Sequence, residues 1–146
     1  MPAKAVDGVV IDANVALKAA LVADGFAAWH RVELHAPSLI WSEAASAASQ
    51  LRWRGEISAE EAVAALGRLR GVALRVVQSA DLVADALELT HRFGWAKTYD
   101  AEYVALAKRL ELPLVTTYGR LAARVRREAT VLTPVELGEL VSAGGS

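Results

Sequence analysis

The stretch Val9-Val10-Ile11-Asp12-Ala13-Asn14 decides the fold that we predict for this sequence of 146 residues. Its first three residues are consecutive, apolar and β-branched, which is typical of a short strand buried on both faces of a parallel sheet. Asp12 follows this strand directly, at the edge where open α/β sheets place their functional sites. Two interpretations of Asp12 are open at this point. It either caps the next helix, since aspartate is a favoured N-cap, or it belongs to a functional site.

The rest of the chain alternates predicted helices and strands. Further strands are expected at residues 33–36, 72–77, 114–117 and 129–132. Helices are expected at residues 14–20, 24–31, 39–54, 59–70, 79–93, 99–110, 121–127 and 134–141. Ser38 and Thr98 are expected helix caps, and Ser58 with Glu61 matches a capping box. This alternation predicts a three-layer α/β/α domain with a mainly parallel sheet of about five strands.

Composition narrows the class of protein. The chain is 54% hydrophobic and 23% charged, which is ordinary for one globular domain, so we expect a single domain over residues 1–146 with residues 1–7 and 143–146 frayed. No apolar run approaches the ~18 residues that a membrane-spanning helix needs, and the N-terminus lacks a secretory pattern. We therefore expect a cytoplasmic protein. The absence of cysteine excludes disulfides and thiolate metal sites, and the net charge of −1 means that any nucleic-acid binding requires a local basic patch.

Three acidic residues stand where the predicted fold reaches the carboxyl edge of the sheet. Asp12 follows the first strand, and Glu43 and Asp100 lie near the starts of two helices. Carboxylates gathered without a counter-charge raise each other's pKa, and a hard divalent cation removes that penalty. Such an ion can also activate water for attack on phosphorus. The three acids make chemical sense as a metal-dependent phosphodiesterase site, although their spacing alone does not establish one.

Four motifs, taken in order, resemble the PIN domain and, more closely, the VapC toxins of bacterial toxin–antitoxin pairs. They are Val-Val-Ile-Asp-Ala-Asn-Val at 9–15, Ser-Glu-Ala at 42–44, Thr-Tyr-Asp-Ala-Glu-Tyr-Val-Ala-Leu-Ala at 98–107 and Leu-Val-Thr-Thr at 114–117. The third motif is the most specific, and the resemblance covers about residues 9–140. It implies a Mg²⁺- or Mn²⁺-dependent endoribonuclease that cleaves cellular RNA, forms a homodimer and is neutralised by a VapB antitoxin.

The resemblance also implies roles for individual residues. Asp12, Glu43 and Asp100 match the family's first three acids, which makes them the expected catalytic residues and metal ligands. Asn14 matches a polar residue that often follows the first acid. Thr116 matches the hydroxyl residue on the fourth strand that orients the first acid.

One position departs from the family pattern. The slot of the usual fourth aspartate holds Tyr118, which is neutral at pH 7 and a poor ligand for Mg²⁺. Three acids can still hold one ion, but a second ion is not expected, and activity could be reduced, shifted toward Mn²⁺ or lost. Tyr118 thus keeps open an alternative function, a catalytically weakened PIN domain that acts by binding RNA or its antitoxin.

Basic and aromatic side chains supply candidate contacts to RNA. Lys97 precedes the Asp100 helix, and Arg120 and Arg124 share one helix face at a spacing of i, i+4, so all three are candidate phosphate contacts. The alternative for the arginines is a solvated helix face. Trp95 is the best candidate for stacking on a base, with core or dimer packing as its alternative. We expect part of the homodimer interface to come from helices between residues 24 and 54.

Overall fold

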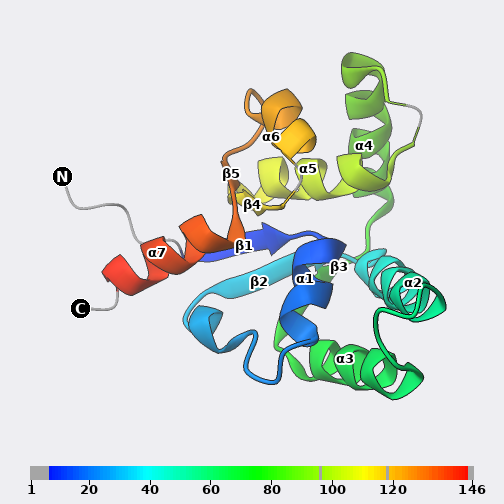
Figure 1. The fold of residues 1–146 in the computed structure, drawn as a ribbon. Coiled ribbons are helices and arrows are strands. Elements are labelled where there is room, and N and C mark those ends of the chain that lie inside the picture. The colour runs from blue at the N-terminus through cyan, green and yellow to red at the C-terminus, as the bar shows by residue number, and fades with distance from the viewer. Residues whose placement is uncertain (1–6, 96, 118, 145–146) are drawn as a thin grey trace.

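The computed structural model describes residues 7–95, 97–117 and 119–144. Its centre is a five-stranded sheet with the strand order β3-β2-β1-β4-β5, in which every neighbouring pair is parallel (Figure 1). The strands are β1 Gly8–Ile11, β2 Glu33–Pro37, β3 Leu74–Val77, β4 Leu114–Val115 and β5 Val131–Leu132. The expected α/β fold with a parallel sheet is confirmed.

Helices cover both faces of this sheet. They are α1 Ala13–Ala20, α2 Ile40–Trp53, α3 Ala59–Gly71, α4 Ala80–Phe93, α5 Tyr99–Leu110, α6 Gly119–Val125 and α7 Pro134–Gly144, with a short 3₁₀ turn, η1, at Ala27–Trp29. One core cluster joins the sheet to α1, α2, α3 and α7. A second cluster joins the other face to α4, α5 and α6 (Figure 1). Within the described residues, no helix is long and apolar enough to cross a membrane.

The central strand β1 shows why its sequence must be apolar throughout. Val9 and Ile11 belong to the core cluster of α1, α2 and α3, whereas Val10 belongs to the cluster of α4 and α5. All three side chains are fully buried. Successive side chains of a strand point to opposite faces, so a strand between two helical layers needs an apolar residue at every position.

The strand order places Asp12 at the point where the chain changes direction across the sheet. The chain runs outward from β1 through β2 to β3, and then returns to the other side of β1 to form β4 and β5. Val10 pairs with Leu114 and Ile11 with Val115, so the residues that follow the two strands emerge side by side. Open α/β sheets bind ligands at such a switch point, outside the carboxyl ends of the strands.

The helix expected at residues 24–31 is wrong, because only η1 forms there. The preceding chain folds back in tight turns, with Val22 N–H donating to Ala19 O and Gly25 N–H to Val22 O. A Cβ on Gly25 would lie 1.8 Å from Ala19 O, so this close approach of the backbone requires glycine. Phe26 and Trp29 still meet edge to face, with ring centroids 6.1 Å apart.

The expected cap Ser38 is wrong, and Thr98 holds the expected N-cap position of α5 without capping the helix through its side chain. Helix α2 begins after Leu39 rather than Ser38, and the side chain of Thr98 makes no capping hydrogen bond to α5. In both places the residue before the helix already has helical backbone angles, whereas side-chain capping needs an extended N-cap. Ser58 has that extended backbone, and its capping box with Glu61 is confirmed.

Other differences concern where elements begin and end. Strands β3, β4 and β5 are shorter than expected, because β4 and β5 pair over only two residues each and β3 pairs from Leu74 onward. Helix α6 begins and ends two residues earlier than expected, whereas α7 continues past Val141 to Gly144. Of the segments expected to fray, residues 1–6 and 145–146 lie outside the described residues.

Candidate active site

Asp12 uses its two carboxylate oxygens differently. Oδ1 accepts a hydrogen bond from the Val15 backbone N–H at 2.8 Å, which caps α1. Oδ2 is buried and has no hydrogen-bond partner among the described residues. Capping therefore accounts for one oxygen only, and the second lacks the hydrogen-bond partner that a buried polar atom usually has.

The surroundings of Asp12 oppose its ionisation. Burial is the main cause that raises the pKa of this carboxyl group above its usual range, and the negative charge of Asp100 raises it further. Interactions with the Thr116 side chain and with the backbone N–H groups of Val15 and Asn14 lower the pKa without cancelling the effect of burial. Thr116, expected to orient Asp12, thus contacts it from the end of the neighbouring strand.

Glu43 lies in the first turn of α2 and is held by a tyrosine from the opposite layer. The Tyr103 hydroxyl donates a hydrogen bond to Glu43 Oε1 at 2.7 Å. Burial raises the pKa of Glu43, the Tyr103 hydrogen bond lowers it, and the charges of Asp100, Asp12 and Glu102 raise it again. The charges that act on Glu43 show that acids from three separate segments lie close enough to repel one another.

Asp100 and Glu102 come from the first turn of α5. Partial burial raises the pKa of both carboxyl groups. Asp100 acts on both Asp12 and Glu43, whereas Glu102 acts on Glu43 and Tyr103. Asp100 is thus part of the acidic group, and Glu102 stands beside it.

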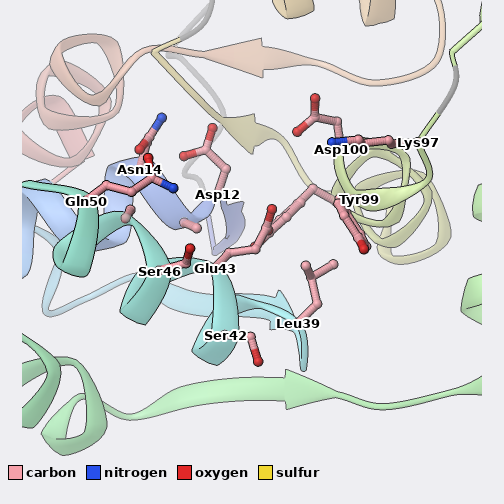
Figure 2. Close-up of a pocket in the computed structure, with 13 residues that line it drawn as sticks. Asp12, Asn14, Leu39, Ser42, Glu43, Ser46, Gln50, Lys97, Tyr99 and Asp100 are labelled. Atoms are coloured by element: carbon pink, nitrogen blue, oxygen red, sulfur yellow. The ribbon is translucent and has the colours of Figure 1, made fainter. Parts of the chain in front are cut away.

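The three expected acids line one cavity of about 700 Å³. Figure 2 shows Asn14 and Gln50 on one side of Asp12, and Glu43, Asp100 and Lys97 toward its other side. The remaining lining residues are Ala13, Leu39, Ser42, Ser46, Ala47, Tyr99 and Tyr103. The structure therefore brings together the end of β1, the first turn of α2 and the start of α5.

Four further residues that were expected at the site are not placed in the cavity lining. Arg124 is exposed on α6 and does not line the cavity. Tyr118 and the side chain of Arg120 lie outside the described residues. Trp95, the candidate for base stacking, instead stacks on Phe93 with ring centroids 4.7 Å apart and packs against the α4–α5 core.

The donor set of this cavity suits a hard divalent cation. Within the part of the chain that the structure describes, no three His, Cys, Asp or Glu side chains converge closely enough to surround an ion. The oxygen chemistry fits nevertheless: Asp12 Oδ2 is buried without a partner, and carboxyl groups with raised pKa values face a common space. Mg²⁺ and Mn²⁺ prefer such carboxylate oxygens and complete their coordination with water.

Three cavity residues escaped prediction although the sequence carried a signal for them. Tyr103 lies three residues after Asp100, and Ser46 and Gln50 lie three and seven residues after Glu43. Residues at these intervals share one face of a helix. Once Asp100 and Glu43 are placed at the site, the helical period alone points to their neighbours.

Comparison with known proteins identifies the family. The sequence profile of the PIN domain matches residues 9–128. The chain belongs to the PIN-domain family. This PIN domain is 36% identical over 116 residues to ribonuclease VapC9 of Mycobacterium tuberculosis strain H37Rv, an alignment that covers 78% of this chain and 88% of VapC9.

Solved structures share the fold of this PIN domain. PAE2754 from Pyrobaculum aerophilum superposes with a TM-score of 0.72 at 22% identity, covering 98% of this chain and 100% of that protein. A chain from the structure of VapBC2 of Rickettsia felis bound to a promoter DNA fragment has a TM-score of 0.63 at 14% identity, covering 86% and 98% of the two chains. At these identities the likeness concerns the fold alone.

Proposed function

We propose that this PIN domain is a VapC-type endoribonuclease toxin that uses Mg²⁺ or Mn²⁺ to hydrolyse phosphodiester bonds in RNA. The observation that carries the proposal is the Asp12 carboxyl group, whose buried Oδ2 lacks a partner among the described residues and which lines a cavity together with Glu43 and Asp100. The family membership and the ribonuclease VapC9 relative support the reaction class.

Different residues of the chain would have different roles at such a site. Asp12, Glu43 and Asp100 would hold the ion through carboxylate oxygens, while Thr116 orients Asp12. The ion, when bound, would polarise a phosphoryl oxygen and lower the pKa of the water that attacks phosphorus. Hydrolysis adds the elements of water across the P–O bond, so no other co-reactant is required.

Basic residues would hold the RNA backbone beside the acids. Lys97 lines the cavity next to Asp100, where its ammonium group can contact a phosphate without replacing a metal ligand. Arg124 and Arg120 belong to α6, which follows β4 at the same edge of the sheet, and we assign them to phosphates farther along the RNA. Asn14 lines the cavity on the opposite side and is assigned to orienting the site.

RNA cleavage by variants in which one acid is replaced by a neutral amide tests this proposal. Asp12→Asn and Asp100→Asn each keep the side-chain shape and remove one charged ligand, so we expect both to reduce cleavage with Mg²⁺ or Mn²⁺ by about 100-fold or more. Asp24→Asn, in an exposed turn remote from the cavity residues, is the matched control and should cleave like the wild type. Cleavage by wild-type protein in excess chelator would contradict metal dependence.

The partner that we propose is a VapB-type antitoxin, and the place of action is the cytoplasm, where cellular RNA is found. The VapC relative and the VapBC2 structure support this assignment. The alternative of a PIN domain that only binds RNA or its antitoxin is less favoured, because the similar protein VapC9 is itself a ribonuclease. Co-expression with a candidate antitoxin should give a stable complex and suppress RNA cleavage.

A further inference from the structure

Tyr103 lines the cavity and joins the two helical layers. Its ring is 2% exposed and belongs to the core cluster of α4 and α5, on one face of the sheet. Its hydroxyl bonds Glu43 of α2, whose buried residues belong to the cluster on the other face. The bond spans 60 positions of sequence and crosses the carboxyl edge of the sheet.

The direction of this hydrogen bond is fixed by chemistry. The Tyr103 hydroxyl carries the hydrogen, and a carboxylate oxygen can only accept, so Tyr103 donates to Glu43 Oε1 at 2.7 Å. A carboxylate with Oε1 held by a donor has the direction of Oε2 fixed as well. A hydrogen bond with one charged partner is also stronger than one between neutral groups.

We propose that Tyr103 is a positioning residue that sets the orientation of Glu43 for binding a divalent cation beside Asp12 and Asp100. The inference rests on the proposed metal-dependent function. The ring alone would satisfy the α4–α5 core, as a phenylalanine would, so packing does not explain the hydroxyl. The hydroxyl finds its partner in a cavity acid rather than in a backbone carbonyl, and this places its effect at the site.

Calorimetric titration of Mn²⁺ into metal-free protein tests the proposal without relying on activity. Tyr103→Phe keeps the buried ring and removes only the hydroxyl, and we expect it to bind Mn²⁺ about tenfold more weakly than the wild type. Thr90→Val is the matched control. Thr90 is a buried hydroxyl in α4 that bonds the Leu87 carbonyl at 2.6 Å, away from the cavity, so this variant should keep wild-type affinity.

A double-mutant cycle distinguishes positioning from a general loss of structure. If Tyr103 acts through Glu43, the variant Glu43→Gln/Tyr103→Phe should bind Mn²⁺ no more weakly than Glu43→Gln alone. Glu43→Asp gives an independent measurement that leaves Tyr103 intact. It keeps the charge but withdraws the carboxylate by one methylene, so its affinity should fall as well.

Each outcome bears on a definite claim. Wild-type affinity in Tyr103→Phe or in Glu43→Asp, or additive losses in the cycle, would overturn the positioning role while leaving the proposed nuclease intact. Equal losses in Tyr103→Phe and Thr90→Val would also overturn it, because the effect would then follow from any buried hydroxyl of this layer. Failure of the wild type to bind Mn²⁺ and to cleave RNA would overturn both proposals.

Discussion

The two carboxylate oxygens of Asp12 have different surroundings. Its Oδ1 caps α1 through the Val15 N–H, while its buried Oδ2 has no partner within the described residues. Leaving an anionic oxygen unsatisfied costs folding free energy, and the raised pKa of Asp12 is the expression of that cost. Such a group is typical of a site where stability is exchanged for affinity toward a ligand.

This cost predicts how the stability of metal-free protein depends on pH. Burial, first of all, raises the pKa of Asp12 and Asp100 above 3.8 and that of Glu43 above 4.5. Groups with raised pKa values contribute stability that is fully present below the unfolded-state values and is lost as the pH rises through the folded-state values. We therefore expect Asp12→Asn to be more stable than the wild type at pH 7, with the two proteins converging toward pH 4.

Urea unfolding in the presence of chelator, from pH 4 to pH 7, measures this difference. The comparison with the variant is essential because Glu128 titrates in the opposite sense: its hydrogen bond to Lys108 lowers its pKa. That contribution is common to both proteins and cancels. A constant difference in unfolding free energy across the whole pH range would show that Asp12 does not carry the predicted penalty.

Position 118 bears on the strength of metal binding. Tyr118 occupies the slot where the family resemblance expects an acid, and it lies outside the described residues. Tyr118→Asp adds a carboxylate, so Mg²⁺ affinity should rise by about tenfold or more, with RNA cleavage rising in parallel. Mn²⁺ should rescue the wild type better than Mg²⁺ does. Titrations of both ions into both proteins provide the measurement, and equal affinities would place position 118 outside the coordination sphere.

At the scale of elements, the first turns of two helices place Glu43 and Asp100 at the cavity. Glu43 lies in the first turn of α2, and Asp100 lies in the first turn of α5. The positive end of each helix dipole favours a carboxylate there and offsets part of the repulsion between the acids. Cavity geometry therefore depends on where these helices begin, and the two helices are tied together by the Tyr103–Glu43 hydrogen bond.

The start of α3 gives a direct test of how capping stabilises an element. Ser58 Oγ accepts from the Glu61 N–H at 3.0 Å, and the Glu61 side chain accepts from the Ser58 N–H at 3.3 Å. Ser58→Ala should lower the free energy of unfolding by about 1 kcal/mol. Ser49→Ala, at an exposed interior position of α2, is the control and should be neutral or slightly stabilising. Equal effects of the two changes in urea unfolding would contradict the role of the cap.

Local sequence signals predicted the elements better than they predicted the contacts between them. The β-branched run Val9–Ile11 located the central strand, because only a strand buried on both faces needs that composition. Ser58 could be identified as a cap, but Ser38 could not be excluded, because capping depends on backbone angles set by packing. The Tyr103–Glu43 hydrogen bond could not be predicted from the sequence, because the helical period shows which residues share a face of one helix but not which two faces meet.

At the scale of the whole molecule, the sheet order and the two layers generate one cavity. The return of the chain across β1 opens the switch point at Asp12, and the layers on either side contribute Glu43 and Asp100. The acids Asp12, Glu43 and Asp100 lie far apart in the sequence. The site therefore forms only when the helices of both layers pack against the sheet. Loss of either layer would leave isolated carboxylates without a shared ligand space.

The outer surface of the α2–α3 layer leads to the last prediction, which concerns self-association. Trp53, at the end of α2, is 82% exposed, and Val63 on α3 is 74% exposed. An exposed tryptophan is costly in water and is among the residues that dominate protein interfaces. We expect a homodimer that buries this surface, in keeping with the expected contribution of helices between residues 24 and 54.

Sedimentation velocity at micromolar concentration should therefore give the dimer mass for the wild type. Trp53→Ser should weaken association by about tenfold or more, because it removes a large apolar contact without disturbing a buried core position. Val135→Ser provides the matched control, since Val135 is 70% exposed and lies on α7, a different element from the two helices that carry Trp53 and Val63. A monomer mass for the wild type, or equal weakening by both substitutions, would show that the α2–α3 surface is not the site at which two copies meet.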